Sequence, residues 1–327
     1  MTARLTRRLA LAATLATLAA APFGTHAQGD FPNKPIRLVV PYAPGAITDT
    51  AARLVAERMS SVLGQQVVVE NRGGAGTRIG VQHVATAAPD GYTLLYVNSI
   101  THGSMPAMSK SLTFEPVKDF APVAPLFWYA NVFVCHPSVP ANTIPELIAY
   151  AKQNPGKLTN ATAGPGSGHD FLGSLFNIMT GVKITHVHYK GGGPALQDVL
   201  AGHVHCIYGD GNAKSLVDAG KLKAMASAGP ARDPVFPNVP TLNEAGVKGF
   251  SLPINHGIAA PAGTPPAIVA RLNAAANEAL KHPQLQQKAR ELGLNVNGGD
   301  PAKLAGVINE DMVKFAKIAN EANIPKE

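Results

Sequence analysis

The chain has 327 residues, of which 46% are hydrophobic and 15% are charged, and its formal net charge is +7 at pH 7. This length exceeds what one hydrophobic core usually supports, so two domains are expected. The positive charge is mild for the length and forms no basic block, which argues against nucleic acid as a partner.

The N-terminus has the pattern of a secretion signal. Arg4, Arg7 and Arg8 precede an apolar run at residues 9–21, and small residues around Ala27 offer a cleavage site. The run is shorter than the ~20 apolar residues that a membrane span needs. Cleavage near Ala27 removes three arginines and no acidic residue, which lowers the net charge to +4. We expect export to the periplasm, and the arginine pair leaves open whether the general secretory or the twin-arginine route is used.

Short β-rich runs alternate with helix-period patterns through most of the remaining chain. Strands are predicted at residues 36–40, 66–70, 93–97, 130–135, 157–161, 183–188, 205–208, 222–226 and 256–260. Helices are predicted between them at 48–63, 79–87, 145–153, 170–180 and 194–201. This alternation predicts an α/β fold with two lobes, each a mainly parallel sheet flanked by helices.

Two proline-rich segments of weak periodicity, 116–125 and 234–245, are interpreted as passages between the lobes. The helical patterns at 268–280 and 304–315 are expected to pack back on the first lobe. The first lobe is therefore expected to be discontinuous, with residues 28–124 and 250–327, and the second lobe to comprise residues 125–249. A ligand cleft between such lobes lies at the carboxyl ends of the strands.

Four glycine-bearing loops follow predicted strands, at residues 41–49, 71–80, 164–170 and 189–194. Glycine lets backbone amides approach a ligand, and amides at a helix N-terminus favour an anion. None of the loops has the Gly-Lys-Ser/Thr of a phosphate-binding loop or the full dinucleotide-binding spacing. The first loop therefore predicts half of a carboxylate clamp, in which Asp49 orients the turn or accepts a hydrogen bond from the ligand.

An exported hydrolase is one alternative. Ser167 lies in the string PGSGH, which lacks the first glycine of a nucleophile elbow, and the adjacent His169 is not placed as a base by adjacency alone. We therefore interpret Ser167 as a hydroxyl donor to a ligand carboxylate or as a helix cap.

A metal-binding receptor is a second alternative. Two His-x-His pairs lie on or beside predicted strands, where residues two apart share a face and could chelate a metal ion: His186, His188, His203 and His205. The cysteines, Cys135 and Cys206, either form a disulfide or serve as two small buried side chains.

Strings throughout the mature chain carry a family resemblance: FPNKPIRLVVPYAPG, ENRGGAGTRIG, GPGSGH and YKGGGPALQDVLAGHV are among them. In number, order and spacing they resemble Bug-type receptors, the periplasmic solute-binding subunits of tripartite tricarboxylate transporters. The resemblance implies a monomeric, hinge-closing receptor for a small organic acid, with membrane transporter subunits as partners. It implies no enzymatic activity, no prosthetic group and no metal.

The resemblance also implies a set of ligand-binding residues, drawn from the glycine loops and from the segment after strand 93–97. By position, the candidates are Tyr42, Ala43, Gly45, Thr48, Asp49, Gly74, Ala75, Thr77, Ser99, Thr101, Gly164, Gly166, Ser167, His169 and Lys190.

This chain departs from the family pattern at several positions near the expected cleft. Ala46 and Thr77 stand where relatives commonly have glycine, Arg78 stands where asparagine is common, and Asn255-His256 replaces an aromatic pair. A guanidinium near the cleft would suit a second ligand carboxylate through bidentate pairing. The sequence does not identify the carboxylate, nor whether Arg78 or Asn255-His256 contacts it.

Overall fold

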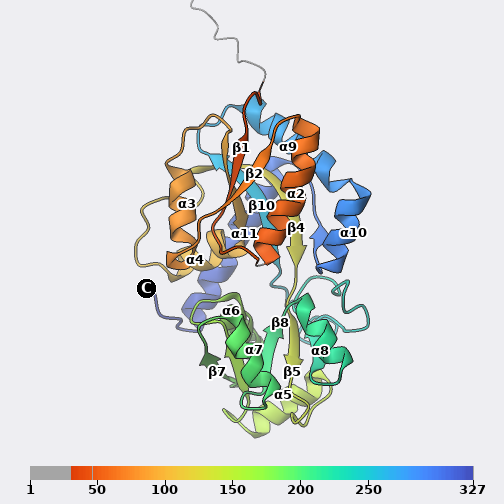
Figure 1. Cartoon of the computed structure of the whole chain (residues 1–327). Coiled ribbons are helices and arrows are strands. Elements are labelled where there is room, and N and C mark those ends of the chain that lie inside the picture. Colours follow the sequence, from red (N-terminus) through yellow and green to blue (C-terminus); the bar gives the residue numbers. More distant parts are fainter. Residues whose placement is uncertain (1–30, 46, 327) are drawn as a thin grey trace, which may run out of the picture. The chain divides into compact units, whose positions relative to one another are not determined.

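The computed structural model describes residues 31–45 and 47–326, so the expected signal segment lies outside the described residues. From Lys34 onward the chain forms one compact unit built around two β-sheets (Figure 1). We call the elements around the first, six-stranded sheet the first lobe and those around the second, five-stranded sheet the second lobe. The predicted α/β fold with two lobes is confirmed.

The first sheet has the strand order β11-β4-β10-β3-β1-β2. Its strands are β1 (Ile36–Val40), β2 (Val67–Asn71), β3 (Thr93–Asn98), β4 (Phe120–Tyr129), β10 (Ile254–Pro261) and β11 (Asn295–Val296). β1 is parallel to β2 and β3, whereas β10 is antiparallel to β3 and β4, and β11 is antiparallel to β4. The sheet is therefore mixed rather than mainly parallel, because β4 carries the chain toward the second lobe and β10 brings it back.

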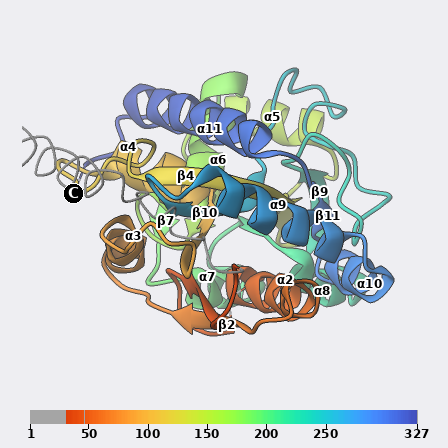
Figure 2. The same cartoon turned by 90° about the horizontal axis from the view of Figure 1, so that it is seen from above.

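Helices cover both faces of the first sheet (Figure 2). One face carries α2 (Ile47–Leu63) and α9 (Pro266–Leu280), with α10 (Pro283–Glu291) beside α2. The other carries α3 (Arg78–Ala85), the helical turn η2 (Ile100–Ser104), α4 (Met105–Met108) and α11 (Pro301–Glu321). The expected packing of the C-terminal helices on this lobe is confirmed, since α9 and α11 both contact β4.

The second sheet has the order β7-β6-β8-β5-β9 and is also mixed. Its strands are β5 (Val132–Cys135), β6 (Thr159–Thr162), β7 (Thr185–His188), β8 (Cys206–Gly209) and β9 (Lys223–Ser227). Helices α5 (Ile144–Gln153), α6 (Gly168–Thr180), α7 (Gly192–Leu200) and α8 (Lys214–Asp218) accompany them. Cys135 and Cys206 face each other across β5 and β8 and form a disulfide, which decides between the two interpretations left open by the sequence.

The segment 116–125, interpreted from the sequence as a passage between lobes, enters strand β4 instead. The pairing of β4 with β10 shifts register twice, so that Val123 and Leu126 have no partner residue on β10. Each lies directly beside a proline, Pro122 or Pro125, and a β-bulge accommodates a residue that has no N–H to donate. Asn273 Nδ2 donates to the bulged Val123 carbonyl at 2.8 Å. The strand was not predicted because its two prolines interrupt the sequence pattern typical of a strand, although they do not end the strand itself.

The segment 234–245 is also not a passage between lobes. Thr241 forms a parallel bridge with Ser227 at the end of β9, and Leu242 N donates to the Ser227 carbonyl at 2.8 Å. Farther on, Phe250 and Leu252 are buried in the core of the second lobe, immediately before β10 begins at Ile254. The chain therefore returns to the first sheet later than the proline-rich composition suggested.

Helix α11 contributes to the cores of both lobes. Leu304 and Ile308, in its first half, are buried with residues of the first sheet and α3. Phe315 and Ile318, farther along, join the core cluster of the second lobe, where the Phe315 and Phe171 rings lie 4.8 Å apart. The lobes are thus joined by the paired strands β4 and β10 and by the packing of this helix.

Candidate functional site

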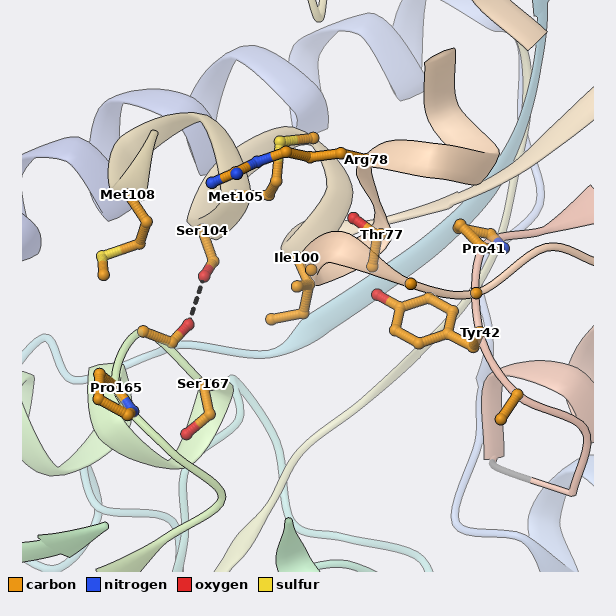
Figure 3. A pocket seen from close by; sticks show the side chains of 15 residues that line it. Pro41, Tyr42, Thr77, Arg78, Ile100, Ser104, Met105, Met108, Pro165 and Ser167 are labelled. Carbon is orange, nitrogen blue, oxygen red and sulfur yellow. Dashed lines mark hydrogen bonds between the residues drawn. The ribbon is translucent and has the colours of Figure 1, made fainter. Parts of the chain in front are cut away.

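A cavity of about 520 Å³ is lined by residues of both lobes (Figure 3). The first lobe contributes the loop after β1, the turn before α3, and the wall formed by η2 and α4; the second contributes the loop after β6. Arg78 is the one charged side chain in this lining, and no acidic side chain lines it. The cavity therefore favours a neutral or anionic ligand over a cationic one.

The loop after β1 is held by the buried carboxylate of Asp49 in the first turn of α2. Asp49 Oδ2 accepts from Gly45 N at 2.9 Å and from Arg53 Nε at 3.1 Å, and Oδ1 accepts from Asn71 Nδ2 at 2.9 Å. Burial alone would raise the pKa of Asp49, but these hydrogen bonds hold it below its ordinary value. Of the two roles predicted for Asp49, these contacts correspond to orienting the turn. The residue does not line the cavity.

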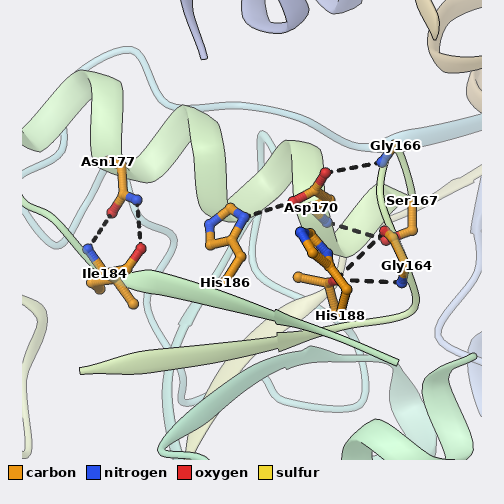
Figure 4. Close-up of polar contacts among 9 residues, drawn as sticks. Gly164, Gly166, Ser167, Asp170, Asn177, Ile184, His186 and His188 are labelled. Carbon is orange, nitrogen blue, oxygen red and sulfur yellow. Dashed lines mark hydrogen bonds and ion pairs between the residues drawn. The ribbon is translucent and has the colours of Figure 1, made fainter. Parts of the chain in front are cut away.

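The loop after β6 is built in the same way (Figure 4). Asp170 Oδ2 accepts from Gly166 N at 2.9 Å, and Oδ1 lies 2.6 Å from His186 Nδ1. Burial acts to raise the pKa of Asp170, but the hydrogen bonds from His186 and Gly166 lower it below its ordinary value. Ser167 caps α6 by accepting from Asp170 N at 3.3 Å, which leaves the Ser167 O–H free to donate.

The turn before α3 has an unusual backbone. Gly74, Ala75, Gly76 and Thr77 all have positive φ, of 117°, 46°, 60° and 80°. This conformation is rare for a β-branched residue such as Thr77, whose buried hydroxyl has no hydrogen-bond partner among the described residues. The turn leads into the half-buried Arg78 at the start of α3.

The two lobes contact each other at one edge of the cavity. Ser104 Oγ donates to the Gly166 carbonyl at 2.7 Å. Gly166 has a φ of +68°, and a Cβ built on it would lie 2.7 Å from Met108 Cε. An alanine at this position would therefore require a strained backbone and a shift of the Met108 side chain.

Six of the predicted ligand-binding residues line the cavity: Tyr42, Ala43, Gly74, Thr77, Gly166 and Ser167. The other nine do not, for different reasons. Gly45, Ala75 and Gly164 belong to the surrounding turns, and Thr48 and Asp49 are buried in α2. The Lys190 side chain is exposed.

Ser99 and Thr101 are buried and hydrogen-bonded inside the first lobe, to Asp311 and to the Asn98 carbonyl respectively. His169 lines a separate cavity of about 280 Å³ with Tyr208 and Asp210.

Asn255 and His256 do not line the cavity either. Asn255 N donates to Ser99 Oγ at 2.8 Å, and its side-chain amide donates to the Asp311 carboxylate. His256 is buried, and its Nδ1 lies 3.0 Å from the Tyr96 hydroxyl. Both residues therefore hold the start of β10 in place. Of the residues at which this chain departs from the family pattern near the cleft, Arg78 and Thr77 line the cavity.

Sequence reasoning missed the wall formed by Ile100, Ser104, Met105 and Met108. The predicted ligand-binding residues of the segment after strand 93–97 ended at Thr101, because the following residues were not assigned to a helix. Ile100, Ser104 and Met108 are spaced four residues apart, which is the spacing of one helix face. That periodicity was the available signal.

The structure does not gather the histidine pairs into a larger cluster of metal-binding side chains. No group of three metal-binding side chains occurs among the residues that the structure describes. His186 contacts Asp170, while His188 and His205 each lie 2.7 Å from a threonine hydroxyl on β6. These contacts account for His186, His188 and His205 as hydrogen-bonding side chains. His203 Nδ1 lies 3.4 Å from Asp198 Oδ1 of α7 at the surface.

The hydrolase alternative has no geometric support either. Within residues 31–45 and 47–326, no histidine is hydrogen-bonded to Ser167, and its hydroxyl caps α6. In the same part of the chain, no helix is long and apolar enough to cross a membrane.

Comparison with known proteins identifies the family. Residues 51–324 match the family described as tripartite tricarboxylate transporter family receptor. Protein BugT of Bordetella pertussis is 33% identical over 89% of this chain and 90% of its own length. Two solved structures from Rhodopseudomonas palustris are also similar. Rpa4515 with adipate has 33% identity and a TM-score of 0.79, covering 91% of this chain and 100% of its own.

The second, MatC with bound malate, has 37% identity and a TM-score of 0.75, covering 88% of this chain and 99% of its own. Members of the family are periplasmic solute-binding receptors rather than enzymes. The chain therefore belongs to the receptor family of tripartite tricarboxylate transporters and is a Bug-type solute-binding protein.

Proposed function

We propose that this receptor binds a small organic carboxylate in the cavity between its lobes. The observation that carries the proposal is the lining itself: two strand-to-helix corners from different lobes face the cavity together with the Ser167 hydroxyl and Arg78, and no acidic side chain lines it. The N-terminal end of a helix favours an anion, and Ser167 caps the N-terminus of α6 beside the cavity. The relatives solved with adipate and with malate support a carboxylate as the ligand.

Closure of the lobes follows from the same geometry. A ligand that contacts both Tyr42 of the first lobe and Ser167 of the second stabilises the closed arrangement over the open one. The Ser104–Gly166 hydrogen bond is available only when the lobes approach, and it adds to that preference. The ligand thereby selects a closed form that a second protein can distinguish.

The remaining parts of the proposal concern location, partners and lobes. We propose that the N-terminal segment directs export and is cleaved near Ala27, and that a monomeric receptor delivers its ligand to membrane subunits of a tripartite transporter. We also propose that the lobes are divided as β4 and β10 suggest, with the first lobe extending through Tyr129 and resuming at Ile254.

Thermal denaturation of the mature protein against a panel of carboxylates and their neutral amides tests the proposal. A carboxylate at about 100 times its Kd should stabilise the protein by ~2.7 kcal/mol, while the amide should not. Gly166→Ala should weaken this effect, because its Cβ would displace the Met108 side chain that lines the cavity. Gly156→Ala is the matched control, since Gly156 has a φ of +77° in the same lobe but no atom nearer than 3.9 Å.

A panel in which no carboxylate raises the melting temperature would overturn the proposal. Equal stabilisation by carboxylates and amides would also overturn it, because the cavity would then not select the anion.

A further inference from the structure

Arg78 is an unpaired cation inside the cavity. Neighbouring arginines have acidic partners: Arg53 pairs with Asp49, and Arg72 pairs with Glu70. Arg78 has no ion pair or hydrogen bond to any other described residue, and its Nε is shielded from solvent without a partner. A half-buried guanidinium in this state loses hydration without receiving compensation from the protein. An anionic ligand group would supply that compensation.

The surroundings of Arg78 are apolar. Figure 3 shows its side chain running from the start of α3 toward the side of the cavity formed by Met105 and Met108. Ile100 and Pro165 complete this part of the lining. The nearby Ser104 hydroxyl already donates to the Gly166 carbonyl. A ligand that extends from the two corners toward Arg78 therefore passes along hydrocarbon and thioether groups.

We propose that Arg78 determines specificity by binding a second carboxylate, so that the preferred ligand is a dicarboxylate with an unsubstituted hydrocarbon spacer. This inference rests on the proposed function, which places the first carboxylate at the corners around Tyr42 and Ser167. The planar guanidinium matches a carboxylate with two parallel hydrogen bonds. A spacer hydroxyl that faces Met105 and Met108 would meet only weak thioether acceptors, which disfavours hydroxylated dicarboxylates.

The methionines also bear on the length of the spacer. Thioether side chains are unbranched and adapt to irregular shapes, so they tolerate spacers that differ by a methylene. Selection is therefore expected to be strong for the second charge and for an unsubstituted spacer, and weaker for spacer length.

Isothermal titration calorimetry with glutarate, pentanoate and 3-hydroxyglutarate, repeated with adipate and hexanoate, tests this inference on the mature protein. Wild type should bind each dicarboxylate at least about tenfold more tightly than the monocarboxylate of equal length. Arg78→Gln should remove about tenfold of dicarboxylate affinity and leave monocarboxylate affinity unchanged. Arg78→Lys should lie between them, because it keeps the charge and loses the fork.

Arg72→Gln is the matched control, since it removes an equal charge close to the turn but outside the cavity lining. It should change neither affinity by more than about twofold. Circular dichroism and melting temperature of each variant establish that the fold is retained.

Equal losses of mono- and dicarboxylate affinity in Arg78→Gln would overturn the assignment of Arg78 to a second carboxylate. No loss at all would overturn it as well. Binding of 3-hydroxyglutarate as tight as that of glutarate would overturn the unsubstituted spacer. If neither class of acid binds wild type, the proposed function itself fails, and the two failures are thus distinguishable.

Discussion

In the two strand-to-helix corners that face the cavity, the loop is held by the same kind of contact, but the aspartate has a different side-chain partner in each. In each corner, a glycine N–H donates to the carboxylate of an aspartate four residues later, Gly45 to Asp49 and Gly166 to Asp170. The N···Oδ2 distance is 2.9 Å in both. The partner of Asp49 is Arg53, whose side chain is 52% exposed, whereas His186 beside Asp170 is only 13% exposed. Water can replace a lost partner at the first corner but not at the second, so the second depends more on its own contacts.

Removal of the disulfide should cause the largest loss of stability, and this loss should be confined to the second lobe. Cys135 and Cys206 are separated by 71 residues and join β5 to β8, next to the strand that precedes Gly166. Closing a loop of this size lowers the conformational entropy of the unfolded chain and so raises its free energy by about 4 kcal/mol. We expect Cys135→Ala/Cys206→Ala to lose about this much stability in urea denaturation.

Hydrogen exchange distinguishes the lobes in the same variant. Amides of β5, β6 and β8 should lose protection, while those of β1 and β3 should keep theirs. Uniform loss across both sheets would show that the lobes unfold as one unit and would remove the basis for comparing the corners separately.

Stability should depend on pH in opposite directions at the two corner aspartates and at a third buried carboxylate, Asp311. The pKa values of Asp49 and Asp170 are lowered, so their contribution is present above about pH 4 and is lost as the pH falls through their lowered values. Burial raises the pKa of Asp311 to about 6, despite hydrogen bonds from Ser99 and Asn255. Its contribution is present below the unfolded value of 3.8 and is lost as the pH rises through about 6.

Asp311→Asn should therefore flatten the dependence of stability on pH between about 4 and 6, by up to about 3 kcal/mol. Chemical denaturation across this range measures it. Asp233, whose pKa burial also raises to about 6, should contribute a separable slope in the same window, which Asp233→Asn removes. A wild-type profile that rises steadily from pH 4 to 6 would contradict both assignments.

Deletion of each corner aspartate tests the comparison directly. Asp170→Ala leaves the buried His186 and the Gly166 amide without their acceptor, and we expect a loss of about 2 kcal/mol. Asp49→Ala should cost only about half as much, because Arg53 can be hydrated. Adding His186→Leu to Asp170→Ala should restore part of the lost stability. Adding Arg53→Leu to Asp49→Ala should restore none of it. Equal costs at the two corners, measured by denaturation, would refute the role assigned to exposure.

Much of the fold was predictable because local signals agreed with the tertiary structure. The predicted strand 36–40 coincides with β1, and the predicted helix 145–153 lies within α5. Strand β4 was not predictable, since its two prolines are tolerated only through bulges that the partner strand β10 and Asn273 complete. No local sequence pattern records such a non-local compensation.

The site divides in the same way. The corners at Tyr42 and Ser167 follow from glycine-bearing turns at helix starts, which are local features. The exclusion of Ser99 from the cavity depends on Asp311, which is 212 residues away and accepts its hydrogen bond at 2.6 Å. Whether a polar residue faces the cavity or the interior is settled by such distant partners. Residues of three of the four predicted glycine-bearing loops line the cavity, but several side chains predicted to do so do not.

The smallest expected effect concerns Thr77, which lies in the cavity lining of the first lobe. Its φ of 80° costs a β-branched residue roughly 1–3 kcal/mol, whereas glycine adopts it freely. Glycine also gains about 0.5–1 kcal/mol of chain entropy in the unfolded state, which offsets part of that relief. Thr77→Gly should therefore stabilise the protein by about 1 kcal/mol, as measured by urea denaturation.

Gly156→Thr in the second lobe is the reciprocal control, because it places the same side chain at a φ of +77° with no close neighbour. It should destabilise the protein by a similar amount. If Thr77→Gly instead lowers stability, then packing of the Thr77 methyl outweighs the backbone strain. The first lobe would then hold its cavity turn by side-chain contacts rather than against a conformational cost, and its resemblance to the second lobe would end at the aspartate corners.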